Sequence, residues 1–291
     1  MKDLGKVSFF LGIEFESDTK TLSICQSRYI SRVLTRFRMH DCKPRSTPCE
    51  LNPKQSMNNV TDSEPLNEQD LKTFRQIVGA LIYIMVATRP DISFIVTRIS
   101  QFMSCAQQNH MIMAKHVLRY LKGTMNDKMV FTKTTTLNIT GFCDADWANG
   151  NDRKSITGYC FRITEKGPMI SWNSRKQKTV ALSSCEAEYM SLCSAVQEGK
   201  YLISFLNEIL DLNQISFDLS CDNQGAIALA KNPVNHKRSK HIDIKYHFVR
   251  DEIIMKRLCV KYISTEENVA DILTKPVSSK RLNKFQSVVM G

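Results

Sequence analysis

No hydrophobic run in this 291-residue sequence is long enough to cross a membrane. The longest, between Ile77 and Ala87, is interrupted by Gly79 and is shorter than the roughly 20 apolar residues that a spanning helix needs. The first residues contain no long apolar stretch before Glu14. We therefore expect neither a signal peptide nor a membrane partner.

Paired cysteines and internal repeats are also missing. The ten Cys residues are scattered and none forms a C-x-x-C pair, which argues against a zinc ribbon or a disulfide-rich secreted frame. We expect reduced thiols in an intracellular protein. No repeat of solenoid length is present. With 42% hydrophobic and 24% charged residues, the chain is suited to two modest folded domains rather than to disorder.

Charge is the first feature that points to a partner. The 40 Lys and Arg residues outnumber the 29 Asp and Glu residues, which gives a net charge of +11. A surplus of this size favours a polyanionic partner, and nucleic acid is the commonest. A basic surface without a specific partner is the alternative.

The first 125 residues are typical of a hairpin followed by helices. We expect strands over Val7–Glu16 and Thr21–Cys25, and helices over Ser27–Met39, Leu71–Ala87, Pro90–Met103 and His110–Lys122. The intervening stretch is polar and rich in proline, which indicates a linker.

The second half alternates strands and helices. Strands are expected at Leu137–Cys143, Ile156–Ile163, Met169–Trp172, Ile215–Cys221 and Leu258–Ser264, and helices at Ser183–Leu210, Asn223–Lys231, His241–Lys256 and Asn268–Lys275. Three antiparallel strands followed by alternating helices and strands predict an α/β (α+β) layer architecture with a mixed sheet.

Acidic residues fall at the ends of these elements. Asp144 ends the first strand of this half, Asp222 follows the fourth, and Asp271 lies in the last short helix. Glu186 and Glu188 lie in the first turns of the long helix. A single such acid is usually a cap or a surface group. Several acids that converge in a basic protein instead indicate a hard dication, Mg²⁺ or Mn²⁺, in a phosphodiester hydrolase.

The stretches around these acids carry a family resemblance. The second half resembles the ribonuclease H domain of copia-type LTR retrotransposon Pol polyproteins, in GFCDADWAN, DRKSITGYCF, ISWNSRKQKTVALSSCEAEY, CDNQGAIALAKNPVNHKRSKHIDIKYHFVRD and ENVADILTKP. The first half is similar to the end of the reverse transcriptase palm, the thumb and the connection, in GKVSFFLGIEF, SRYISRVLTRFRMHDCKPRSTP, FRQIVGALIYIMVATRPDISFIV and HVLRYLKGT.

The resemblance implies a division of the chain. Residues 1–50 would be the partial palm-end hairpin and helix, 51–68 a linker, 69–125 the helical thumb and connection, 137–276 the ribonuclease H domain and 277–291 a C-terminal tail. The implied fold is a ribonuclease H-like mixed five-stranded sheet with flanking helices.

The resemblance also implies a four-acid site. Asp144, Glu188, Asp222 and Asp271 match the acids that hold two Mg²⁺ ions, for which Mn²⁺ can substitute. Glu186 and Glu188 point about 200° apart on a helix, so both cannot face one site. The family places its Glu in an Ala-Glu-apolar triplet, which matches Glu188 and leaves Glu186 as a capping or surface acid. His241 and His247 are either assistants to this site or packed and surface residues.

The function implied by the resemblance is endonucleolytic cleavage of the RNA strand of RNA–DNA hybrids. The candidates for contacts with the nucleic-acid backbone are Arg153, Lys154, Arg175, Lys176 and Lys178. The alternative for each is a plain solubilising charge. The alternative is a catalytically silent, nucleic-acid-binding remnant of a retroelement.

No Asp-Asp pair occurs in the sequence, so we expect a Pol chain truncated before the polymerase site, without reverse transcriptase activity of its own. The implied setting is a cytoplasmic virus-like particle or the nucleus, with other Pol or capsid proteins as partners.

Overall fold

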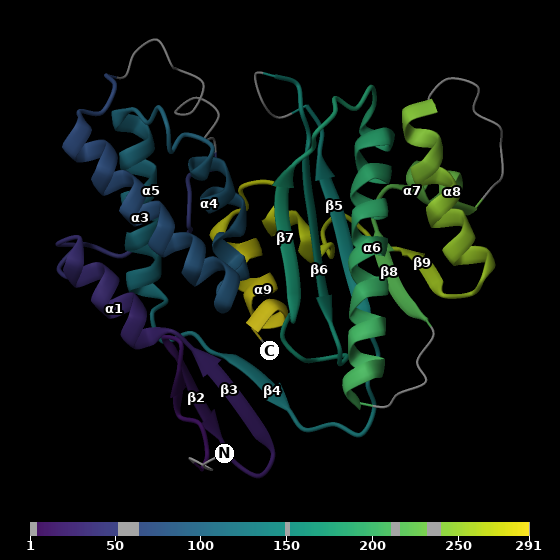
Figure 1. Ribbon diagram of the computed structural model, residues 1–291, viewed down its shortest axis with the longest axis horizontal. Helices are drawn as coiled ribbons and strands as arrows, with labels where there is room; N and C mark the ends of the chain where they lie inside the picture. Colours follow the sequence, from purple (N-terminus) through teal and green to yellow (C-terminus); the bar gives the residue numbers. More distant parts are fainter. Residues whose placement is uncertain (1–4, 52–63, 149–151, 211–215, 232–239, 291) are drawn as a thin grey trace. The chain divides into compact units, whose positions relative to one another are not determined.

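A computed structural model of the chain describes residues 5–51, 64–148, 152–210, 216–231 and 240–290 (Figure 1). These residues form two compact units, one of Met1–Lys133 with Pro276–Gly291 and one of Thr134–Lys275. Most of the predicted linker 51–68 lies outside the described residues. The finer domain boundaries given above stay predictions.

The first unit contains a four-stranded antiparallel sheet in the order β1-β2-β3-β4. Its strands are β1 (Phe9–Phe10), β2 (Ile13–Ser17), β3 (Thr21–Cys25) and β4 (Met129–Thr132). The predicted first strand is broken between β1 and β2, where Leu11 and Gly12 both adopt positive φ and turn the chain. Strand β4 was not predicted, and it pairs antiparallel with β3.

Helices complete the first unit. They are α1 (Ser27–Arg36), α3 (Glu68–Ala87), the 3-10 helix η1 (Pro90–Ile92), α4 (Ser93–Ser100), α5 (Gln108–Gly123) and α9 (Ser279–Met290). Asn67 caps the start of α3, because its side chain accepts a hydrogen bond from the Asp70 N–H. The helix buries Phe74 and Leu81. The residues expected to form a C-terminal tail therefore contain a packed helix, α9, which buries Phe285.

The second unit is built on a five-stranded mixed sheet in the order β7-β6-β5-β8-β9. The strands are β5 (Thr140–Asp146), β6 (Ile156–Arg162), β7 (Ser171–Lys176), β8 (Phe217–Cys221) and β9 (Leu258–Tyr262). Strands β5, β6 and β7 pair antiparallel, whereas β8 runs parallel to both β5 and β9. The predicted fold class, a ribonuclease H-like mixed sheet with flanking helices, is confirmed.

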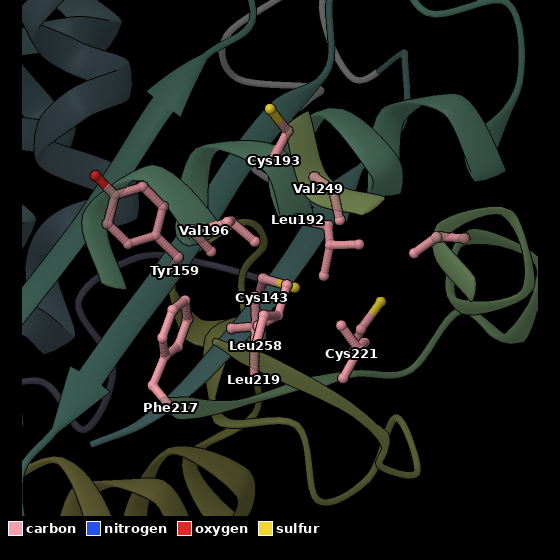
Figure 2. Packing of buried hydrophobic residues seen from close by; sticks show 14 of the residues in the cluster. Cys143, Tyr159, Leu192, Cys193, Val196, Phe217, Leu219, Cys221, Val249 and Leu258 are labelled. Atoms are coloured by element: carbon pink, nitrogen blue, oxygen red, sulfur yellow. The ribbon is translucent and has the colours of Figure 1, made fainter. Parts of the chain in front are cut away.

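One face of this sheet is covered by α6 (Ser184–Leu210), with α7 (Gln224–Lys231) and α8 (Lys240–Ile254) beside it (Figure 1). The core under α6 includes Cys143 and Cys221 from neighbouring strands and Leu192 and Val196 from the helix (Figure 2). Because side chains alternate across a strand, Cys143 points into this core and Asp144, the next residue of β5, points away from it.

The 3-10 helix η2 (Val269–Leu273) packs against β5 and β6. Gly158 of β6 makes this approach possible. A Cβ atom at position 158 would lie 2.6 Å from Thr274 Cγ2 and 2.9 Å from Leu273 Cβ. Gly158 is also the cross-strand partner of Asp144, so the missing side chain brings η2 against the sheet beside that acid.

No helix among the described residues has the length and apolar character needed to traverse a bilayer.

Candidate metal centre

Asp144 lies near the end of β5 and is only 2% exposed. The Ser191 hydroxyl of α6 donates to its backbone carbonyl at 2.7 Å and to that of Gly158 at 3.2 Å, which joins helix and strands at this point. The Thr274 hydroxyl donates to its carboxylate oxygen Oδ2. Helix α6 and Thr274, the residue after η2, therefore both hold Asp144 in place.

Asp271 lies in η2, which places it next to Asp144. Asn268 precedes the 3-10 helix, accepts a hydrogen bond from the Ala270 N–H, and donates its side-chain amide to the Cys143 carbonyl at 3.0 Å. The second contact attaches η2 to β5 next to Asp144. Asp271 is fully buried.

Asp222 follows the last residue of β8 and accepts a hydrogen bond from the Thr265 hydroxyl at 2.7 Å. It is half-buried. Asp144, Asp222 and Asp271 each offer a carboxylate oxygen, and these three oxygens lie within 4.8 Å of one another. Three acids that are distant in the sequence thus meet at one corner of the second sheet.

Glu188 reaches the same corner from α6. It is 7% exposed, and its ligand atom lies within 4.8 Å of those of Cys221 and Asp222. Its Oε2 atom is buried and has no hydrogen-bond partner among the described residues. Glu186 instead accepts the Leu182 N–H at 2.9 Å at the start of α6, which is a capping contact.

A lysine that the sequence did not single out lies among the acids. Lys275 Nζ is 2.9 Å from Asp271 Oδ1 and 3.9 Å from Asp144 Oδ2. Its position four residues after Asp271 was the available signal, because such a spacing on a helical turn brings two side chains together. Thr265 and Thr274 were also missed, and nothing in their sequence pattern marks them.

The acids raise one another's proton affinity. Burial raises the pKa of Asp144 to about 7, with Lys275 opposing the rise and Asp271 adding to it. Burial also raises the pKa of Glu188 to about 10, with Asp144, Cys221 and Asp222 contributing. For Lys275 burial lowers the pKa, but Asp144 and Asp271 outweigh it and the pKa is raised. The corner therefore favours bound positive charge.

These residues fit a divalent ion. The donors around Asp144, Asp222 and Asp271 are carboxylate oxygens, which Mg²⁺ and Mn²⁺ prefer. The buried Oε2 of Glu188 supplies a further oxygen without a partner among the described residues. The arrangement is a carboxylate cluster compatible with metal binding.

Comparisons with known proteins bear on the family to which the chain belongs. The family model for reverse transcriptase (RNA-dependent DNA polymerase) matches residues 1–51. The "Retrovirus-related Pol polyprotein from transposon TNT 1-94" of Nicotiana tabacum is 42% identical over 98% of this chain and 21% of its own length. The corresponding polyprotein from transposon RE1 of Arabidopsis thaliana is 40% identical over 99% of this chain and 19% of its own. The chain belongs to the copia-type retrotransposon Pol family.

This copia-type Pol chain spans about a fifth of the length of those curated relatives. Among solved structures it is similar to LC11-RNase H1 isolated from compost, with 19% identity, a TM-score of 0.36, and coverage of 50% of this chain and 96% of that one. It is also similar to the foamy viral protease-reverse transcriptase, with 11% identity, a TM-score of 0.42, and coverage of 73% and 41%.

Of the two histidines singled out in the sequence, only the side chain of His247 is among the described residues. His247 lies exposed on α8, and neither candidate group of metal-ligating residues contains it. The side chain of His241 lies outside the described residues. No assisting role is therefore supported by the described part of the chain.

Cationic side chains gather in a groove of about 400 Å³ on the second unit. Arg175, Lys176 and Lys178 from the end of β7 line it together with Lys245 of α8. Three of these four were among the candidates for contacts with a nucleic-acid backbone, and Lys245 was not. Arg153 and Lys154 do not line this groove.

Proposed function

We propose that this chain cleaves the RNA strand of RNA–DNA hybrids as the ribonuclease H part of a copia-type Pol polyprotein. The observation that carries the proposal is the convergence of Asp144, Glu188, Asp222 and Asp271 at one corner of a ribonuclease H-like sheet. Carboxylates crowded in this way repel one another, and divalent ions relieve the repulsion.

The four acids would hold two Mg²⁺ ions, or Mn²⁺ in their place. When bound, such ions activate a water molecule and stabilise the departing 3′ oxygen, which leaves a 5′ phosphate and a 3′ hydroxyl. Thr274 and Thr265 orient the carboxylates of Asp144 and Asp222 through their hydroxyl groups. Lys275 supplies positive charge next to Asp144 and Asp271.

The substrate proposal depends on charge. The groove lined by Arg175, Lys176, Lys178 and Lys245 would hold phosphates, while 2′-hydroxyl contacts would select RNA. The chain carries no Asp-Asp pair, so we propose no DNA synthesis by this chain alone. The setting we propose is intracellular, in a cytoplasmic virus-like particle or the nucleus, among other Pol or capsid proteins.

A cleavage assay with variants tests the proposal. The purified chain is incubated with an end-labelled RNA–DNA hybrid, with Mg²⁺ or EDTA, beside Asp144→Asn and the exposed-site control Asp251→Asn. We expect Mg²⁺-dependent cutting by the parent and by D251N, and a loss of at least a hundredfold in D144N. Salt-sensitive binding without cutting would favour the silent remnant instead. A primer-extension assay on the same protein should give no DNA product.

A further inference from the structure

A thiol lies beside the carboxylates. Cys221 is the last residue of β8, is fully buried, and immediately precedes Asp222. Its Sγ atom and one carboxylate oxygen each from Glu188 and Asp222 lie within 4.8 Å of one another. An ion with bonds of about 2.0–2.3 Å to sulfur and oxygen can contact all three after small side-chain movements.

Two further observations point to a ligand at this place. The Oε2 atom of Glu188 is buried, and no described residue hydrogen-bonds to it. Cys185 lies three residues before Glu188 on α6, which places the two side chains on one face of the helix. The corner thus holds an oxygen that lacks a partner among the described residues, together with a second sulfur nearby.

The chemistry of this donor set differs from that of the four acids. Mg²⁺ binds oxygen and has little affinity for sulfur, whereas a thiolate selects Zn²⁺, Cd²⁺ or Co²⁺. We propose that Cys221, Glu188 and Asp222 form a binding site for a thiophilic divalent cation of the Zn²⁺ class. Binding forms a metal–sulfur bond and releases the thiol proton of Cys221 to solvent.

The site shares two ligands with the acid cluster. A thiophilic ion on Glu188 and Asp222 therefore excludes Mg²⁺ from them, and Zn²⁺ inhibits the nuclease. This consequence rests on the proposed function, but the binding of the ion does not.

Cobalt provides a direct readout of binding. Co²⁺ is titrated into the full chain in a thiol-free reductant, and the thiolate-to-cobalt charge-transfer absorption is recorded. The wild type should show a saturable band that Zn²⁺ abolishes, and Cys221→Ser should lack it. Cys193→Ser is the matched control, because Cys193 is a buried cysteine of the same core that lies away from Cys221 (Figure 2). We expect it to keep the band.

The outcomes decide the proposal. No band in the folded wild type, or an equal band in C221S, would overturn it. If C221S does not fold, Glu188→Gln provides the second test, because it should weaken Co²⁺ binding about tenfold while the sulfur band persists at saturation. Unchanged affinity in E188Q would contradict the ligand set.

A second measurement separates this inference from the proposed nuclease. In the wild type at fixed Mg²⁺, added Zn²⁺ should stop hybrid cleavage, and a higher Mg²⁺ concentration should restore it. In the separate Co²⁺ titration, a higher Mg²⁺ concentration should weaken the cobalt band. A cobalt band without any cleavage would support the metal site and refute the nuclease. Cleavage that is indifferent to Zn²⁺ would refute shared ligands.

Discussion

Lys275 places an ammonium group between acids that a divalent ion would need. It lies 2.9 Å from Asp271 Oδ1 and 3.9 Å from Asp144 Oδ2, and it is only partly exposed. A lysine in this position stabilises the crowded carboxylates and also competes with a dication for them. Lys275 therefore reduces the repulsion among the carboxylates and also lowers their affinity for a metal ion.

Replacing this lysine should separate the two effects. Lys275→Met should bind Mn²⁺ about tenfold more tightly, since one positive charge is removed from the site. In EDTA the same variant should unfold at lower temperature, because the acids lose their counter-charge. Calorimetric titration and thermal unfolding measure the two effects, with the exposed Lys280→Met as control. Weaker Mn²⁺ binding in K275M would show that the lysine organises the site rather than competing with the metal.

At the scale of elements, the approach of η2 to the sheet determines where Asp271 lies. Gly158→Ala would place a methyl group 2.6 Å from Thr274 Cγ2 and 2.9 Å from Leu273 Cβ. We expect η2 to shift, a loss of about 1–3 kcal/mol in the free energy of unfolding, and weaker Mn²⁺ binding.

A second glycine in the chain provides the control for that substitution. A Cβ atom at Gly79 in α3 meets nothing within 4 Å, so Gly79→Ala should stabilise the protein by up to about 1 kcal/mol. Urea unfolding and Mn²⁺ titration of the two variants form the comparison. Equal Mn²⁺ affinity in G158A and the parent would contradict the role given to η2.

The start of α5 gives an expected pH dependence. His110 is buried, stacks on Phe102, and accepts the Gln107 N–H through Nδ1 at 3.0 Å. Burial lowers its pKa from 6.5 to about 4. Between these values the unfolded chain binds a proton that the folded chain does not, so stability is present above pH 6.5 and falls as the pH drops toward 4.

The variant His110→Gln tests that expectation. An amide oxygen can still accept the Gln107 N–H but does not titrate in this range. The parent should lose at most about 3 kcal/mol more than H110Q between pH 7.5 and 4.5, measured by urea unfolding at both values. Parallel losses in the two proteins would exclude His110 as the cause.

At the scale of the whole molecule, each unit has its own internal network. In the first, Arg89 and Asp91 are both buried and form two hydrogen bonds, at 2.9 and 2.6 Å. Tyr120 donates to Asp91 at 2.6 Å, and Arg89 donates to the Thr124 carbonyl at 2.8 Å. This network joins η1 to the end of α5.

Breaking that network should affect one unit only. Asp91→Ala leaves a buried guanidinium without its counter-charge and should cost about 3–5 kcal/mol in the first unit. Mn²⁺ binding by the acids of the second unit should persist wherever that unit stays folded. Scanning calorimetry with and without Mn²⁺ separates the loss of stability in the first unit from Mn²⁺ binding by the second. A Tm equal to that of the parent would show that the ion pair contributes nothing net.

The sequence predicted most of the second unit because its elements are long and their patterns are local. It missed β4, since a four-residue strand whose partner β3 lies more than a hundred residues earlier has no local signal. It missed α9, although Leu282, Phe285 and Val289 are spaced on one helical face. Glu188 was chosen over Glu186 because it matches the family triplet. The roles of Lys275 and Cys221 could not be predicted in full, because they also depend on residues that are close in space but distant in sequence.

The chain leaves its first unit at Lys133 and returns to it at Pro276. A premature stop codon just after Pro276 would therefore spare every proposed metal ligand and still delete the buried face of α9, which packs on η1 and β4. The loss of packing would destabilise residues 1–133, which are translated first and are far in sequence from the stop codon. Shortened copies of such an element should then fail through insolubility of their amino-terminal part before they fail through lost catalysis.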